Sequence, residues 1–321
     1  MRIFKLFLRP LAICIYTGIF YLLCQLAGKF WFADLASHFK LHAAVGAALF
    51  SLLFISRGKR YRIHALCMLM FSLSFTICAY ILFSPAAAPL GVAKTNIKIL
   101  QFNVLYKNEE FAKSIPWIIS QNADIVVLQE VNDARAKELD ELKAHYKWSQ
   151  VKLNPRREAF GMAIFSNLPV TKFDYVNIGG GWNKYTRTEF MLDEIPFHLY
   201  ELHTPPPMSG LFSRERNRAL SLMADLLASD QTPHRILLGD LNTTIYSPYF
   251  TNILKKADMH HAQRDFNMQG TWPSTLPMPL RIGIDHIIAS RQVKIESREV
   301  QGYQGSDHLP VITKLTLYKD E

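Results

Sequence analysis

The stretch DIVVLQE at residues 124–130 indicates the fold, because four consecutive apolar residues lead directly to Gln129 and Glu130. An apolar run of this length predicts a strand buried on both faces. The segment IKILQFNV at 97–104 has a similar apolar character and carries Asn103 near its end. Since a buried charge is costly unless it is paired or binds metal, we expect the ends of these strands to form a polar site.

Further apolar runs of strand length occur between helical patterns, without strict alternation, and the strands outnumber the helices. This order favours sheets packed on each other with helices outside, an α/β sandwich. The strand-like runs lie at 161–165, 190–192, 197–202, 235–238, 284–289 and 309–317, and the helical patterns at 111–121, 134–145, 213–229 and 249–257.

Polar residues with catalytic potential fall at the ends of these predicted strands. Buried strands seldom carry such groups unless they are paired or bind metal, so a set of them on one edge predicts a polar pocket. The residues are Asn103, Glu130, His203, Asp240, Asn242, Asp285, Asp307 and His308.

The positive charge of the chain is confined to its N-terminal part. Residues 1–96 hold ten Lys and Arg and one acidic residue, Asp34, whereas the whole chain holds 36 basic and 27 acidic residues. Residues 97–321 therefore hold 26 of each and are formally neutral. This neutrality is not the basic footprint of a dedicated nucleic-acid-binding domain. All four cysteines lie in the first 96 residues, without the spacing of a metal site.

Three apolar stretches, at 11–27, 42–55 and 64–83, predict three transmembrane helices. The second stretch is short unless it begins near Leu35. We therefore expect a transmembrane region at 1–84, a linker at 85–96 and a catalytic domain at 97–321. The chain is expected to be embedded in the membrane through its N-terminal helices.

Basic residues predict the orientation of this region. Three of them precede the first stretch, and four lie between the second and third, at 57–62. The positive-inside rule places both groups in the cytoplasm, so three spans would put the catalytic domain on the extracytoplasmic face of the inner (cell) membrane. If the second stretch does not span, the domain is cytoplasmic.

Six short motifs follow one another at strand ends. They are FNV at 102–104, LQE at 128–130, LH at 202–203, GDLN at 239–242, IDHI at 284–287 and SDHLP at 306–310. In this order they resemble the endonuclease/exonuclease/phosphatase superfamily, which includes DNase I-like nucleases, and the chain is similar to a membrane-anchored bacterial member. The resemblance covers nearly all of 97–321 and implies a four-layer α/β sandwich, two packed mixed β-sheets flanked by helices.

The resemblance also implies a metal centre and a catalytic histidine. Glu130 matches the metal-binding glutamate, with Asn103 and Asp307 beside it, and the implied ion is Mg²⁺ or Mn²⁺, which prefers oxygen ligands. His308 matches the catalytic histidine. Asp285 matches the carboxylate that orients its ring and stabilises its charged form.

Four further residues match positions around the phosphate group. Asp240 matches the residue that activates or aligns the attacking water, and Asn242 the amide that helps to hold phosphate and nucleophile. His203 and, with a looser local pattern, Arg187 match phosphate-contacting positions. Asn103 matches a substrate contact as well as a metal-site residue.

The implied enzyme is a divalent-metal-dependent phosphoric ester hydrolase in which water attacks phosphorus in line. We predict a phosphodiesterase or nuclease acting on a phosphate ester, with nucleic acid one candidate substrate. The alternatives are a phosphatase or phosphodiesterase for lipid or inositol-phosphate headgroups, and an inactive scaffold. No obligate protein partner is indicated. Leu105 stands where some relatives carry a carboxylate, which favours one metal ion over two.

Two features stay open between a structural and a binding role. Three basic residues precede the predicted strand at 161–165 and form either a solvated face or a contact for phosphate or acidic headgroups: Lys152, Arg156 and Arg157. The loop GGGW at 179–182 carries an aromatic ring that could stack on a base or lean on a membrane.

Overall fold

The computed structural model describes Ile15 and residues 18–55, 62–70, 72–73, 91–261 and 269–319. The chain divides into two compact units. One comprises residues 1–85 and 246–248, and the other, called the catalytic unit below, comprises 86–245 and 249–321.

The N-terminal unit is helical where it is described, with α2 (Trp31–Ser37) and α3 (Lys40–Ile55) as its named helices. Within the described residues, no single helix is both long and apolar enough to cross a membrane. The pair Trp31–Ser37 and Lys40–Leu53 passes by length and composition but bends by 56°. The prediction of three transmembrane helices is therefore not supported, and parts of the predicted stretches 11–27 and 64–83 lie outside the described residues.

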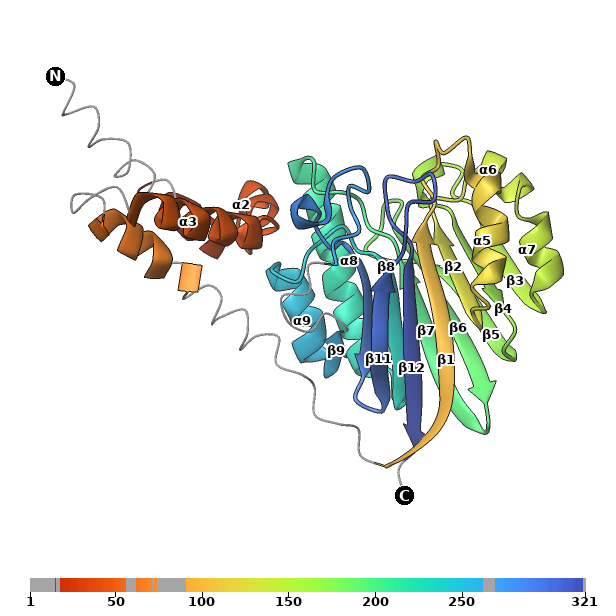
Figure 1. Cartoon of the computed structure of the whole chain (residues 1–321). Helices are drawn as coiled ribbons and strands as arrows, with labels where there is room; N and C mark the ends of the chain where they lie inside the picture. The colour runs from red at the N-terminus through yellow and green to blue at the C-terminus, as the bar shows by residue number, and fades with distance from the viewer. Residues whose placement is uncertain are drawn as a thin grey trace. The chain divides into compact units, whose positions relative to one another are not determined.

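The catalytic unit is built on two six-stranded sheets (Figure 1). β1 and β2 are parallel neighbours in the first sheet, β7 and β8 in the second, and the other neighbouring pairs are antiparallel, so both sheets are mixed. The first sheet has the order β11 (Val293–Val300), β12 (Val311–Lys319), β1 (Val92–Asn103), β2 (Ile125–Gln129), β4 (Met162–Ser166), β3 (Trp148–Lys152). The second has the order β5 (Val170–Asn177), β6 (Lys184–Leu192), β7 (Ile195–Leu202), β8 (His234–Asp240), β10 (Asp285–Ser290), β9 (Met259–His261).

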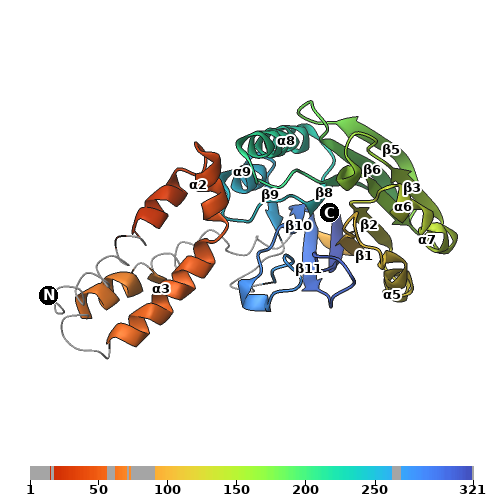
Figure 2. The same cartoon turned by 90° about the horizontal axis from the view of Figure 1, so that it is seen from above.

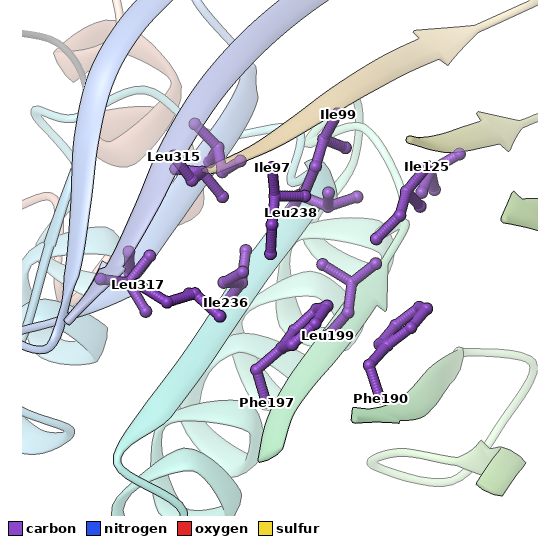
Figure 3. Close-up of a cluster of buried hydrophobic side chains, with 14 of the residues drawn as sticks. Ile97, Ile99, Ile125, Phe190, Phe197, Leu199, Ile236, Leu238, Leu315 and Leu317 are labelled. Carbon is purple, nitrogen blue, oxygen red and sulfur yellow. The ribbon is translucent and has the colours of Figure 1, made fainter. Parts of the chain in front are cut away.

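Apolar side chains between the sheets form the central core, and Figure 3 shows ten of them labelled. Ile97, Ile99 and Ile125 come from the first sheet and face Leu199 and Leu238 of the second. All of these side chains are buried, because each strand directs alternate residues toward the other sheet. The prediction of two packed mixed sheets is confirmed.

Helices cover the outer face of each sheet, and Figure 2 shows α8 and α5 on opposite sides. The first sheet packs against η1 (Phe111–Ser114), α5 (Ile115–Ser120) and α7 (Asp140–His145), with α6 (Asp133–Lys137) beside them. The second packs against α8 (Gly210–Ser229) and α9 (Pro248–Lys256). Two short 3₁₀ turns, η2 (Glu158–Phe160) and η3 (Met278–Leu280), lie in loops.

Strand direction brings the predicted site residues to one edge. β1 and β2 end together at Asn103 and Gln129, and β8 ends at Asp240 beside Asp285, the first residue of antiparallel β10. β12 runs antiparallel to β1, so the loop before Val311 reaches the same edge. Residues far apart in sequence are thus collected above the two sheets.

The boundary of the catalytic unit differs from the sequence-based expectation. β1 begins at Val92 and pairs with β12 from there, so residues 92–96 of the predicted linker are strand. Residues 85–90 lie outside the described residues.

Candidate active site

Asn103 joins the two sheets at the edge. Its Nδ2 donates to Oε1 of Glu130 over 2.9 Å and to Oδ2 of Asp240 over 3.0 Å. The second carboxylate oxygen of Glu130 accepts from the backbone N–H of Tyr106 over 3.2 Å. One amide therefore fixes two carboxylates, one from each sheet, at a separation that a shared ligand can bridge.

The backbone at this edge is held in left-handed conformations. Glu130 has φ 61°, Leu105 φ 59° and Asn242 φ 45°, although none of them is glycine. Such residues cost free energy and cluster at functional sites, where the surrounding structure holds them in place. Gly239 has φ 141°, and a Cβ there would lie 2.0 Å from the carbonyl oxygen of Leu202. Only glycine lets β8 approach β7 closely enough to bring Asp240 beside His203.

His308, Asp285 and Asp240 form a buried charged group. Nδ1 of His308 lies 2.9 Å from Oδ2 of Asp285, and Nε2 lies 3.6 Å from Oδ2 of Asp240. Burial lowers the pKa of His308, but the charges of Asp285 and Asp240 outweigh it and raise the pKa to about 10. Burial raises the pKa of Asp285, but the charge and hydrogen bond of His308 reverse this, so the net shift is downward. The pair is an imidazolium bound to a carboxylate.

His203 is a second buried imidazole beside Asp240. Its Nε2 lies 3.6 Å from Oδ2 of Asp240 and 4.0 Å from Oε1 of Glu130. Burial and the charge of His308 lower the pKa of His203 to about 3, so this ring is neutral. The ring of Phe160 stacks on it at 4.8 Å between centroids. The two histidines thus have different charge states.

Burial destabilises the ionised forms of two carboxylates in this group. It raises the pKa of Glu130, against the hydrogen bond from Asn103. It also raises the pKa of Asp240, to about 8, against the charge of His308. Both groups therefore favour an additional positive charge nearby.

Asn242 supports Asp240. Its backbone N–H donates to Oδ1 of Asp240 over 2.9 Å, and its Nδ2 donates to the carbonyl of Thr204 over 2.8 Å and to Oδ2 of Asp240 over 3.2 Å. Arg216 in α8 is fully buried and donates from Nη1 to the carbonyl of Asn242 over 3.0 Å. Arg216 thereby holds the turn that carries Asp240 and Asn242, although none of the six motifs includes it.

Asp307 has an oxygen to which none of the described residues donates a hydrogen bond. Its Oδ2 accepts from Nε1 of Trp272 over 3.1 Å, whereas its Oδ1 is buried without a hydrogen-bond partner. Ser306 fixes the loop by donating from Oγ to the carbonyl of Asn103 over 2.7 Å. A buried carboxylate oxygen without a donor suits a cation ligand.

The donor set fits a hard divalent cation. Glu130, His203 and Asp240 each offer one ligand atom within 4.8 Å of the others, and so do Asp240, Asp285 and His308. In the second group, Nδ1 of His308 is bound to Asp285, and Nε2 lies 3.6 Å from Asp240. Of the ligands predicted from the sequence, Glu130 and Asn103 are in contact, and Asp307 has an oxygen to which no described residue donates, so these three remain candidates for a metal that prefers oxygen ligands.

The structure collects eight of the predicted residues and leaves Arg187 elsewhere. Arg187 lies within β6, where its Nη2 is 2.9 Å from Oε1 of Glu189 and 3.3 Å from Nδ1 of His198. His198 in turn lies 2.7 Å from Asp230, the residue that ends α8. Arg187 belongs to this separate ionic cluster because it occupies the middle of a strand, not its end. Its predicted phosphate contact is not supported.

The motifs and geometry agree with the comparison to known families. The chain belongs to the endonuclease/exonuclease/phosphatase family, whose model matches residues 100–308. Members of this family are typically metal-dependent phosphoester hydrolases. A search of curated proteins found no match.

Solved structures share the fold. An endonuclease/exonuclease/phosphatase from Beutenbergia cavernae has a TM-score of 0.57 at 19% identity, covering 70% of this chain and 72% of that one. Truncated TDP2 from Caenorhabditis elegans has a TM-score of 0.54 at 15% identity, covering 69% and 97%. The human nocturnin catalytic domain, with a bound sulfate anion, has a TM-score of 0.56 at 14% identity, covering 70% and 96%.

Proposed function

We propose that this chain is a divalent-metal-dependent phosphodiesterase that hydrolyses its substrate by attack of water on phosphorus. The observation that carries the proposal is the convergence of His308, Asp285 and Asp240 beside the Asn103–Glu130 pair. This arrangement supplies a cationic donor, a carboxylate base and oxygen ligands for a cation at one edge.

Asp285 and His308 stabilise negative charge. Asp285 accepts a hydrogen bond from Nδ1–H of His308. The Nε2–H of His308 is therefore directed toward Asp240 and any group bound between them. The imidazolium donates to a phosphoryl oxygen as its charge grows in the transition state. His203 remains neutral and can donate to a second phosphoryl oxygen without adding a full charge.

Asp240 orients the attacking water and takes its proton. His308 already carries its proton, so the base must be another group, and Asp240 lies opposite it at 3.6 Å. The raised pKa of Asp240 makes it a stronger base than an exposed aspartate. Asn242 holds the carboxylate in place through two hydrogen bonds.

The metal would be held by Glu130, Asn103 and Asp307, and Mg²⁺ and Mn²⁺ both suit these oxygens. When bound, the cation would neutralise charge on the phosphoryl oxygens and orient the phosphate group.

The test is hydrolysis of bis-p-nitrophenyl phosphate by the full chain in detergent. We expect turnover with Mg²⁺ or Mn²⁺, none with chelator, and a loss of at least 100-fold in kcat for His308→Ala. His145→Ala, an exposed histidine at the end of α7, is the matched control and should retain activity. Full turnover by His308→Ala would exclude this mechanism.

We also propose that the N-terminal unit attaches the catalytic unit to a membrane, with the latter on the extracytoplasmic face. The concentration of basic residues in 1–96 and the apolar, exposed side chains of α3, such as Leu49, Leu52 and Leu53, support this. A reporter active only outside the cytoplasm, fused after Lys319, should be active, and a reporter active only inside should be silent. The reverse result would contradict the orientation.

A lipid or inositol-phosphate headgroup is the second candidate substrate, because an attached enzyme meets such groups at the surface of its own membrane. Hydrolysis of phospholipid vesicles that exceeds hydrolysis of DNA and RNA would favour it. Cleavage of nucleic acid without any hydrolysis of lipid would exclude it.

A further inference from the structure

We propose that Arg157, Trp182 and Phe212 form a binding subsite for a second phosphate group of the substrate, next to the reaction centre. The proposal rests on the proposed function and names the class of substrate, one that carries a further phosphate beside the scissile one. The three residues come from three separate loops or helix ends, and no motif of the family marks them.

The guanidinium of Arg157 lies on two aromatic rings. Its carbon is 4.5 Å from the centroid of the Trp182 ring and 5.9 Å from that of Phe212, and the two rings meet edge to face at 5.8 Å. Arginine stacks on aromatic faces in this way while the edges of its planar group keep their N–H donors free. The rings thus hold the guanidinium in one plane.

The loop that carries Trp182 is itself fixed. Gly179, Gly180 and Gly181 have φ of 75°, 78° and 63°, so these glycines allow a turn that other residues would resist. The carbonyl of Trp182 accepts from Nδ2 of Asn154 over 3.1 Å. The cluster is therefore preorganised, which reduces the entropy lost when a ligand binds.

Short connections join the cluster to the reaction centre on both sides. The carbonyl of Arg157 accepts from the N–H of Phe160 over 2.9 Å, and Phe160 stacks on His203. Phe212 lies one helical turn before Arg216, which donates to the carbonyl of Asn242. A turn of helix rises only about 5.4 Å, so the cluster lies at the border of the reaction centre.

The ligand favoured by this cluster is an anion. Arg157 is exposed, and among the described residues no carboxylate pairs with its guanidinium. Since the guanidinium occupies a face of the Trp182 ring, that face is closed to a stacking base. The free donors of arginine match the oxygens of a phosphate group, which they bind in a bidentate fork.

Two kinds of substrate offer a second phosphate. A polynucleotide carries one on the next nucleotide, and a polyphosphorylated headgroup carries one on the same ring. A diester with a single phosphate, such as bis-p-nitrophenyl phosphate, reaches only the reaction centre.

The experiment compares kcat/KM of the full chain on bis-p-nitrophenyl phosphate, on a short oligonucleotide and on vesicles containing a phosphoinositide. We expect Arg157→Gln to lower kcat/KM about 10-fold on at least one substrate with several phosphates. It should leave bis-p-nitrophenyl phosphate within about twofold, and Arg157→Lys should restore part of the loss. Arg156→Gln is the control, because Arg156 is an exposed neighbour without a ring contact among the described residues, and it should leave kcat/KM on all three substrates unchanged.

The pattern of losses identifies the source of the second phosphate. A loss on the oligonucleotide alone indicates a nucleic-acid strand, and a loss on the vesicles alone indicates the headgroup. Equal losses on all three substrates, or no loss on either multiply phosphorylated one, would overturn the subsite.

Binding separates this inference from the proposed function. If the unaltered chain hydrolysed none of the substrates, the function would fail. The affinity of the chelator-treated protein for the oligonucleotide and for the phosphoinositide vesicles would still test the subsite. We expect weaker binding of at least one by Arg157→Gln than by Arg156→Gln, and equal binding of both would overturn it.

Discussion

Gln129 donates a hydrogen bond from Nε2 to Oε1 of Glu201 over 3.1 Å, and the two residues belong to different sheets. Gln129 directly precedes Glu130, and Glu201 lies two residues before His203. Glu201 is fully buried and also accepts from Oγ1 of Thr186 over 3.2 Å. This polar contact thus crosses the apolar core just below the active-site edge and fixes the position of the two sheets relative to each other there.

Glu201 should make stability depend on pH. Burial raises its pKa from 4.5 to about 8 in the folded protein, against the hydrogen bonds from Gln129 and Thr186. Because the pKa is raised in the folded protein, the neutral acid makes its full contribution to the free energy of unfolding below the pKa of the unfolded chain, near 4.5. This contribution is lost as the pH rises toward 8. We expect Glu201→Gln to increase the free energy of unfolding at pH 8 by about 2–4 kcal/mol, with little change below pH 4.5.

Urea denaturation at pH 4.5 and pH 8 measures this difference. Gln keeps an acceptor for Gln129, so the polar contact survives the change. If the variant and the unaltered protein lost stability equally between these two pH values, the buried acid would not be the cause.

Asp285 should affect turnover through its hydrogen bond to the ring of His308. Asp285→Asn removes the charge opposite Nδ1 of His308 and leaves a group of similar size. The amide can present its N–H to the ring and favour the wrong tautomer, so we expect kcat to fall by roughly 10²–10⁴-fold. Steady-state kinetics on bis-p-nitrophenyl phosphate measures the loss, and circular dichroism checks the fold. A loss confined to KM would contradict an orienting role.

Trp272 should affect the affinity for the metal ion through its hydrogen bond to Asp307. Trp272→Phe keeps a ring but removes the donor to Oδ2 of Asp307. Replacing a residue that hydrogen-bonds to a metal ligand typically weakens metal binding. We therefore expect the Mg²⁺ concentration for half-maximal activity to rise about 10-fold. A titration with Mg²⁺ measures it. A lower kcat at an unchanged half-saturation would assign the tryptophan to the reaction and not to the metal.

Gly239 should tolerate no side chain. A Cβ at this position would lie 2.0 Å from the carbonyl oxygen of Leu202, and the φ of 141° disfavours any other residue. We expect Gly239→Ala to lower the free energy of unfolding by at least about 2 kcal/mol, or to prevent folding. Gly302→Ala has no atom within 4 Å of its Cβ and serves as the control in thermal unfolding. Equal melting temperatures of the two variants would contradict the close approach of β7 and β8.

The sequence allowed the central strands to be predicted because they are buried on both faces and therefore apolar throughout. β2 and β8 are of this kind. The missed strands differ: β3 and β5 have no buried residue, β11 is mostly half-exposed or exposed, and β9 has only three residues. Their pairing depends on neighbours that a local pattern does not reveal.

The site residues at strand ends were found through the motifs that carry them, and those away from strand ends were not. Arg216 shares a helix with the exposed Arg214 and Arg218, and only tertiary packing distinguishes it as buried. Arg187 was predicted from a loose motif, and the structure places it in the middle of β6, paired with Glu189 and not at a strand end. Arg157 and Trp182 were recognised separately, but only the fold joins them.

The two ends of β1 lie at opposite edges of the catalytic unit. Val92 pairs with Lys319, so the point where the chain enters the unit and the point near which it leaves lie together (Figure 1). Asn103 stands at the other end of the same strand, about 35 Å away at the usual rise per residue. Within the catalytic unit, the length of β1 therefore separates the paired residues Val92 and Lys319 from the edge that holds the site residues.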